Sequence, residues 1–352
     1  MLCQLYHKKM IDVLAKKTFL ALVNPFSTVK EVETLAINPA FNWLKANEKA
    51  YYIGIKDTPI IPKSIIQKLI PYGCFYHTKD VMAYGGRAID MYLVNPLTGL
   101  RMSGSSSGTA LNVFYHINDI GIGTDGGGSV LAPASSLNLY GFISSMIEQE
   151  HVNSYQKTST DGIHFSPSIG LITRDLETLK LAACALLVTT ENNCDCQIMM
   201  VDKKAVNPHV IPDYDRVAHL LKSEVTFVDA PRLHESREKL IDFITATVIN
   251  DQVLVSIEGP IDRMGIGDSI YGSFDATTKN SQMQSGKGLM RVANMANKMA
   301  CSVPLQGLGV CALIICEDKE ELLPTIWKIA QVLQVDTAPV VTSYFSNLDM
   351  YL

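Results

Sequence analysis

The sequence has 352 residues, of which 47% are hydrophobic and 18% are charged, and its formal net charge is −5. This composition is typical of a globular protein with a large core and excludes a disordered chain. The acidic balance gives no electrostatic footprint for a nucleic acid or an anionic membrane surface, so we expect neither as a partner.

The length alone would suit about two domains of roughly 150 residues each. The chain, however, has no internal repeat and no linker long enough to divide it. We therefore expect one domain over residues 1–352, with residues 1–48 as a helical or irregular N-terminal extension. No apolar run reaches the roughly 18 residues that a membrane span needs, and no signal peptide is evident, so we expect a cytoplasmic protein.

Segments with strand and helix periodicity alternate along the chain, which predicts an α/β fold. In chain order, we expect strands at 51–56, 117–123 (after a turn), 225–229, 252–257 and 310–316. We expect helices at 65–70, 109–115, 175–188, 235–248, 288–300 and 320–333. The helix at 175–188 is the clearest of the first half, and Thr173 or Asp175 can cap its start.

Two stretches are dense in glycine and serine: residues 99–108 (GLRMSGSSSG) and residues 121–128 (GIGTDGGG). Such runs are often flexible linkers, but here they flank one helix and one strand, which favours a functional site. The second stretch also matches G-x-G-x-x-G. A dinucleotide fold would need a long helix after it, and Pro133 interrupts that helix early. We expect no nucleotide cofactor.

The glycines that precede Ser129 suit a nucleophile loop. Residues without Cβ let successive backbone N–H groups converge on one point, as an oxyanion hole requires. None of the eight histidines has a neighbourhood that nominates it as the base for this serine. A lysine can serve instead if burial lowers its pKa, and Lys56 ends the apolar segment YYIGIK.

Taken together, these residues resemble the amidase signature family. Residues 103–110 (SGSSSGTA) and 123–134 (GTDGGGSVLAPA) are similar to its pattern GGSSSGS…GTDxGGSxRxPA. Weaker similarity at 92–96, 170–175 and 294–304 extends the resemblance over about residues 50–335. It implies a single α/β domain with a mixed β-sheet core flanked by helices on both faces, and cleavage of a C–N amide bond through an acyl-serine.

The resemblance also implies roles for single residues. Ser129 would be the nucleophile, Ser105 the cis-serine that relays a proton, and Lys56 the base; Ser129 follows Ser105 by 24 residues, as in the family. A cis peptide bond would precede Ser105, and Asp125 would fix the loop by binding its backbone N–H groups. The oxyanion hole would be formed by Gly126, Gly127 and Gly128.

The sequence departs from the family pattern in two places that bear on the substrate. Leu131 stands where the family usually has an arginine, which argues against a small anionic amide. Lys56 and Ser105 are closer in sequence than in typical members, and the missing segment corresponds to the loop where substrate entrance elements often lie. We therefore expect a small-molecule amide as substrate and assign no substrate-binding residue.

Two other functions stay open at this point. The chain could be an amide or acyl transferase that uses ammonia or an amine as acceptor, or a non-catalytic binding subunit. A homo-oligomer or a partner subunit is compatible with the sequence. We expect no cofactor and no metal, because Cys194 and Cys196 lack the second pair that a zinc site needs.

Overall fold

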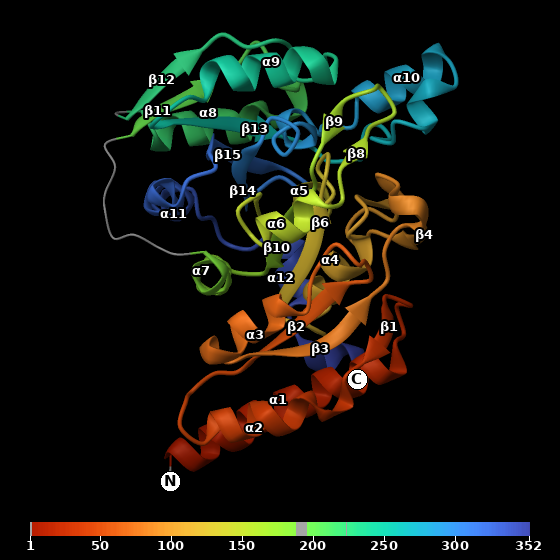
Figure 1. Ribbon diagram of the computed structural model, residues 1–352, viewed down its shortest axis with the longest axis vertical. Helices are drawn as coiled ribbons and strands as arrows, with labels where there is room; N and C mark the ends of the chain where they lie inside the picture. The colour runs from red at the N-terminus through yellow and green to blue at the C-terminus, as the bar shows by residue number, and fades with distance from the viewer. Residues whose placement is uncertain (1, 188–195, 223) are drawn as a thin grey trace.

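The computed structural model describes residues 2–187, 196–222 and 224–352. Its centre is an eleven-stranded sheet with the order β1-β3-β2-β6-β10-β7-β14-β15-β13-β11-β12 (Figure 1). The strands are β1 Val29–Val32, β2 Tyr51–Lys56, β3 Cys74–Asp80, β6 Ile120–Asp125, β7 Tyr140–Ser144, β10 Ser168–Thr173, β11 Gln197–Val201, β12 Val225–Val228, β13 Gln252–Glu258, β14 Lys298–Pro304 and β15 Cys311–Glu317.

The sheet is mixed. Strand β2 runs parallel to both β3 and β6, and β11 runs parallel to β12 and β13, whereas the strands between β6 and β13 pair antiparallel. Two hairpins lie outside it: β4 Ile89–Val94 with β5 Arg101–Ser103, and β8 Lys157–Thr158 with β9 His164–Phe165. The predicted α/β class with a mixed sheet is confirmed.

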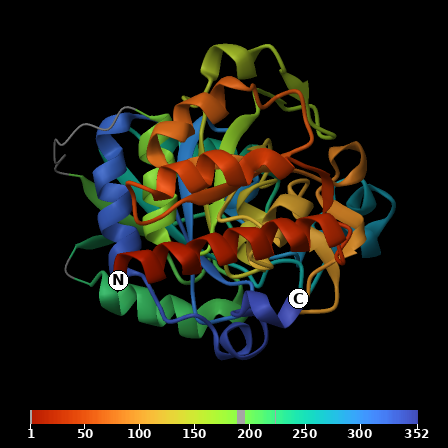
Figure 2. The same cartoon turned by 90° about the horizontal axis from the view of Figure 1, so that it is seen from below.

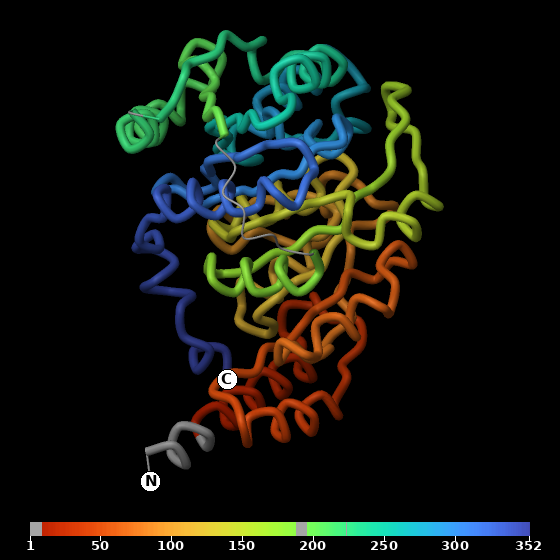
Figure 3. The backbone as a smooth tube through the Cα atoms, turned by 60° about the vertical axis from the view of Figure 1, so that its left-hand side comes forward, coloured from red at the N-terminus to blue at the C-terminus, as the bar shows by residue number. Residues whose placement is uncertain are grey.

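Helices cover both faces of the sheet (Figures 1 and 3). Helices α3, α7 and α11 pack in one row, and α4 packs beside α5. The helices are α1 Leu2–Val23, α2 Ile37–Leu44, α3 Ser64–Leu69, α4 Ser107–Phe114, α5 Leu131–Ser136, α6 Gln149–Asn153, α7 Leu176–Leu186, α8 Ile211–Leu220, α9 Arg237–Thr247, α10 Ala276–Met283, α11 Leu323–Val332 and α12 Pro339–Phe345.

The N-terminal 48 residues contribute more than an extension. Helices α1 and α2 lie side by side across one end of the molecule (Figure 2), and β1 pairs with β3 as the edge strand of the main sheet. The C-terminal residues return to α1, where Lys16 forms an ion pair with Asp349 at 3.0 Å. The first and last parts of the chain therefore pack together.

The first serine loop lies close to the sheet because α4, which follows it, packs tightly against β6. The alternation I-G-I-G in β6 directs Gly121 and Gly123 toward α4. A Cβ on Gly121 would lie 2.6 Å from Thr109 Cγ2, and one on Gly123 would lie 2.6 Å from Ser106 Oγ. Because these side chains are absent, α4 and the turn before it can approach the sheet closely.

One predicted helix is wrong. Residues 288–300 form a short 3₁₀ turn at Leu289–Arg291, followed by further turns and then strand β14, which lies between β7 and β15. Every residue of β14 is buried, so both faces of the strand lie inside the molecule and it lacks the alternation that would have revealed it. Asn297 takes a left-handed conformation with φ 52°, which ends the turn before the strand.

The other predicted elements fall within a few residues of those observed. Helix α7 begins after Asp175, whose carboxylate accepts a hydrogen bond from Thr178 N at 2.8 Å, as expected of an N-cap. The predicted end of this helix, at residue 188, lies outside the described residues. No helix in the described ranges is both long and apolar enough to cross a membrane.

Candidate active site

Lys56 lies at the carboxyl end of β2, beside the end of β6. Its Nζ donates a hydrogen bond to Ser105 Oγ at 2.7 Å and another to Thr124 Oγ1 at 2.9 Å. The lysine is only 3% exposed and Ser105 only 4%. The parallel pairing of β2 with β6 therefore holds a buried amine directly against the serine loop.

Burial lowers the pKa of Lys56 from 10.5 to about 7, because the charged form loses its hydration. Repulsion from Lys157 lowers the pKa further, and the Asp125 carboxylate acts in the opposite direction. A substantial fraction of the amine is therefore neutral near pH 7, and a neutral amine can accept a proton.

A main-chain hydrogen bond joins the two serine loops. Ser106 N donates to Ser129 O at 3.2 Å, and Gly104 N donates to Ala88 O at 2.7 Å. The peptide bond between Gly104 and Ser105 is not cis; in the described part of the chain the one cis bond is Gly259–Pro260. The predicted cis bond is therefore wrong in this structure, where the turn is made by Gly104 in a left-handed conformation with φ 71°.

Asp125 organises the second loop. Its carboxylate accepts hydrogen bonds from four backbone N–H groups, at 2.6–3.3 Å, those of Gly127, Gly128, Val130 and Leu131. The expectation that Asp125 fixes the loop is confirmed. Because it engages Gly127 and Gly128, the N–H groups of the loop that it leaves unbound are those of Gly126 and Ser129.

Ser129 is half-buried. Its carbonyl oxygen accepts from Ser106 N, but within residues 2–187, 196–222 and 224–352 its hydroxyl has no hydrogen-bond partner. Ser105 Oγ, by contrast, is held by Lys56. The structure thus brings Lys56 of β2 and the two serine loops together, and among the described residues the Ser129 hydroxyl has no hydrogen-bond partner.

Two residues at this site were missed in the sequence. Thr124 accepts a hydrogen bond from Lys56, and its place next to Asp125 in the motif could have revealed it. Asp90 accepts from Ser107 Oγ at 2.6 Å and from Tyr92 N at 2.8 Å, so it anchors the first serine loop from β4. No sequence signal connects Asp90 with that loop.

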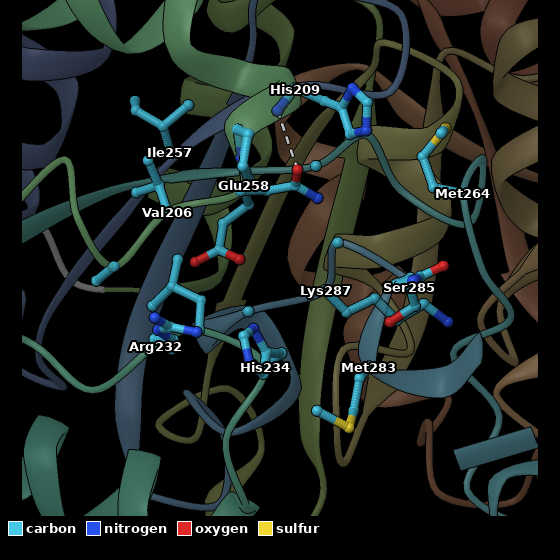
Figure 4. Close-up of a pocket in the computed structure, with 18 of the residues that line it drawn as sticks. Val206, His209, Arg232, His234, Ile257, Glu258, Met264, Met283, Ser285 and Lys287 are labelled. Carbon is cyan, nitrogen blue, oxygen red and sulfur yellow. Dashed lines mark hydrogen bonds between the residues drawn. The ribbon is translucent and has the colours of Figure 1, made fainter. Parts of the chain in front are cut away.

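A cavity of about 590 Å³ opens beside the second loop (Figure 4). Its lining includes the carboxyl end of β13, the segment 204–209 that follows β11, residues 282–288 and Arg291. None of the predicted triad residues lines it. The loop nevertheless abuts the wall, because a Cβ on Gly128 would lie 3.6 Å from Arg291 Cα.

Glu258 is the one carboxylate among the residues that line this cavity, and it is 1% exposed. Its Oε1 accepts from Ser256 Oγ at 2.8 Å and from Leu289 N at 3.0 Å. Burial raises the pKa of Glu258 from 4.5 to about 7. Within the described ranges, no group of three or more His, Cys, Asp or Glu side chains could hold a metal ion, and Cys194 lies outside those ranges.

Comparison with known proteins agrees with this geometry. Residues 91–217, which contain both serine loops, match the family model described as Amidase. Amidase 1 of Arabidopsis thaliana is 38% identical over 98 residues, which are 26% of this chain and 21% of that protein. The part of the chain that carries both serine loops is therefore similar in sequence to amidases. The matched segment spans about a fifth of the length of the curated relative.

Three solved structures share the fold of this chain. A peptide amidase from Stenotrophomonas maltophilia superimposes with a TM-score of 0.61 at 13% identity, over 95% of this chain and 96% of that chain. A 6-aminohexanoate cyclic dimer hydrolase in complex with its substrate gives 0.63 at 13% identity, over 95% of each chain. An amidase family protein from Bacillus anthracis gives 0.59 at 13% identity, over 96% and 94%. The amidase fold therefore extends over nearly the whole chain.

Proposed function

We propose that this chain hydrolyses a C–N amide bond of a small molecule through an acyl-serine intermediate on Ser129. The observation that carries the proposal is the buried contact between Lys56 Nζ and Ser105 Oγ at 2.7 Å. A lysine buried beside a serine, with a pKa near neutrality, is suited to activate a nucleophile rather than to form an ion pair.

In the proposed reaction, neutral Lys56 accepts the proton of Ser105. Ser105 Oγ takes the proton of Ser129 as Ser129 Oγ attacks the amide carbonyl carbon. The proton then returns through Ser105 to the leaving nitrogen as the C–N bond breaks. Water hydrolyses the acyl-serine by the same relay and regenerates Ser129.

Of the predicted oxyanion-hole residues Gly126, Gly127 and Gly128, only Gly126 would donate its N–H to the oxyanion of the tetrahedral intermediate, together with the N–H of Ser129. Asp125 already binds the N–H groups of Gly127 and Gly128. In this arrangement Gly126 and Ser129 are the first donors to the oxyanion, and Asp125 keeps the loop in shape for them.

The proposal is tested by ammonia release from a panel of primary amides, measured for the wild type and for Ser129→Ala. We expect hydrolysis of at least one amide, reduced by 10³-fold or more in Ser129→Ala. Ser154→Ala, which alters an exposed serine at the end of α6, serves as control and should keep the wild-type rate. Equal rates for Ser129→Ala and the wild type would overturn the proposal.

A further inference from the structure

Arg291 is a cation without a counter-ion at the wall of the cavity. Its Nε donates to Gly288 O and its Nη2 to Leu233 O, both at 3.2 Å, and Nη2 also donates to Glu235 O. No carboxylate forms an ion pair with it in the described part of the chain. Burial lowers the pKa of Arg291 from 12.5 to about 10, and repulsion from Arg237 acts in the same direction, whereas Glu258 and Asp161 act against it.

Glu258 presents a second unsatisfied group to the same cavity. Its Oε2 is buried and has no hydrogen-bond partner among the described residues. In Figure 4 its carboxylate points toward the part of the cavity where Arg232 and His234 lie. Since its pKa is near 7, a large fraction of this carboxyl is uncharged at neutral pH, and its hydroxyl can then donate to a ligand.

The remaining charges on the lining are cationic. Lys204 and Arg232 are exposed at the cavity, while Lys287 is neutralised by Asp262 at 2.8 Å. Glu258 is the one acidic side chain among the lining residues, and it is partly neutral. The cavity therefore favours an anion. Nη1 of Arg291 donates to no group among the described residues, so it can donate to a carboxylate oxygen of a ligand.

We propose that this cavity binds the carboxylate of the amide substrate, with Arg291 as its charge partner and Glu258 as its hydrogen-bond partner. The inference rests on the proposed function and names the substrate class. The main chain of Arg291 lies against the nucleophile loop, since a Cβ on Gly128 would lie 3.6 Å from its Cα, so this wall of the cavity adjoins the loop that carries Ser129. Leu131, which stands where the family usually has an arginine, argued against a small anionic amide. That argument does not apply if Arg291 supplies the positive charge that binds the carboxylate.

The carboxylate could sit on the acyl part or on the amine part of the amide, and binding distinguishes the two. Succinamate carries it on the acyl part and N-acetylglycine on the amine part; their neutral counterparts are succinamide and N-acetylglycinamide. Isothermal titration with Ser129→Ala measures affinity without turnover. We expect either succinamate or N-acetylglycine to bind at least tenfold more tightly than its neutral counterpart. The compound that does so shows whether the substrate carries its carboxylate on the acyl part or on the amine part of the amide.

Arg291→Met in the Ser129→Ala background should abolish this preference. Arg101→Met is the matched control, because Arg101 also donates to a main-chain carbonyl, that of Tyr92, but lies outside the cavity. If Arg291→Met does not fold, Arg291→Lys keeps the positive charge but lacks the guanidinium. This variant should lower the preference for the carboxylate over its neutral counterpart at least threefold. Equal binding of charged and neutral amides, or a preference that survives in the Arg291 variants, would overturn the inference. Failure of wild-type hydrolysis alone would overturn the proposed function and leave the binding result intact.

Discussion

Lys56 Nζ lies 2.7 Å from Ser105 Oγ, although 49 residues separate the two in the sequence. The contact forms because β2 ends beside β6, against which the loop before α4 is packed. Thr124 of β6 holds the same amine from the other strand at 2.9 Å. The distance between the Lys56 amine and Ser105 thus depends on the pairing of β2 with β6.

The first prediction concerns the pH dependence of hydrolysis. Because Lys56 acts as a neutral amine, protonation below its pKa of about 7 removes the base. We expect kcat/KM to rise about tenfold per pH unit below pH 7 and to level off above it. The profile is measured from pH 5 to pH 9 with a reactive amide. A rate that is constant or falling from pH 5.5 to pH 8.5 would refute this role of Lys56.

The second prediction separates Ser105 from its neighbour. Ser105→Ala removes the proton relay and should lower kcat by about 10²–10⁴-fold. Ser106 is the matched control, since its hydroxyl is also buried but has no partner in the described part of the chain. Ser106→Ala should therefore change kcat by less than threefold. A similar loss in both variants would mean that the loop tolerates no substitution and that the relay is unsupported.

The contribution of Asp125 can be measured as stability. Removing its carboxylate leaves four backbone N–H groups without an acceptor, two of them in the glycine loop. We expect Asp125→Ala to lower the free energy of unfolding by at least about 1–3 kcal/mol, the cost of one unsatisfied buried group, and to lower kcat as well. Urea denaturation followed by circular dichroism provides the measurement. Unchanged stability in Asp125→Ala would show that water replaces these bonds.

Asp80 should make stability depend on pH. Burial raises the pKa of this side chain from 3.8 to about 7, while Thr78 and Asn112 donate hydrogen bonds to it at 2.6 and 2.7 Å. The folded state therefore retains a proton that the unfolded state loses. The stability that this proton provides is complete below pH 3.8 and is lost as the pH rises through about 7.

Comparison with Asp80→Asn isolates that contribution. The variant keeps an acceptor for Asn112 and has no charge to bury. Relative to the wild type, we expect Asp80→Asn to gain free energy of unfolding as the pH is raised from 5 to 8. Chemical denaturation at both pH values gives this difference. A difference that stays constant between them would contradict the buried, protonated carboxyl.

The two serine loops and the base were predictable because each has a local signature. Ser105 and Ser129 lie in dense glycine and serine motifs, and Lys56 ends an apolar strand. Asp125 was assigned its loop-fixing role from the same motif. The assignment of these residues to catalysis stays a prediction, as does the single domain over residues 1–352, the assembly state and the cytoplasmic location.

Features that arise from tertiary packing were not predictable. Strand β14 falls within the helix expected at 288–300, because a strand that is buried on both faces shows no alternation of polar and apolar residues. The cis bond before Ser105 was carried over from the family, whereas Gly104 makes the turn with a positive φ. The cavity could not be foreseen, since Glu258 and Arg291 meet there only when β13 ends beside the turn at Leu289–Arg291.

The central claim, that Lys56 activates Ser129 through Ser105, is tested most directly by acylation of the enzyme. A serine-reactive acyl probe is incubated with the wild type and with Lys56→Ala at pH 7.5, and the labelling rate and site are read by mass spectrometry. We predict that the wild type is labelled at Ser129 and that Lys56→Ala is labelled at least 100-fold more slowly. Equal labelling of Ser129 in both proteins would contradict the account.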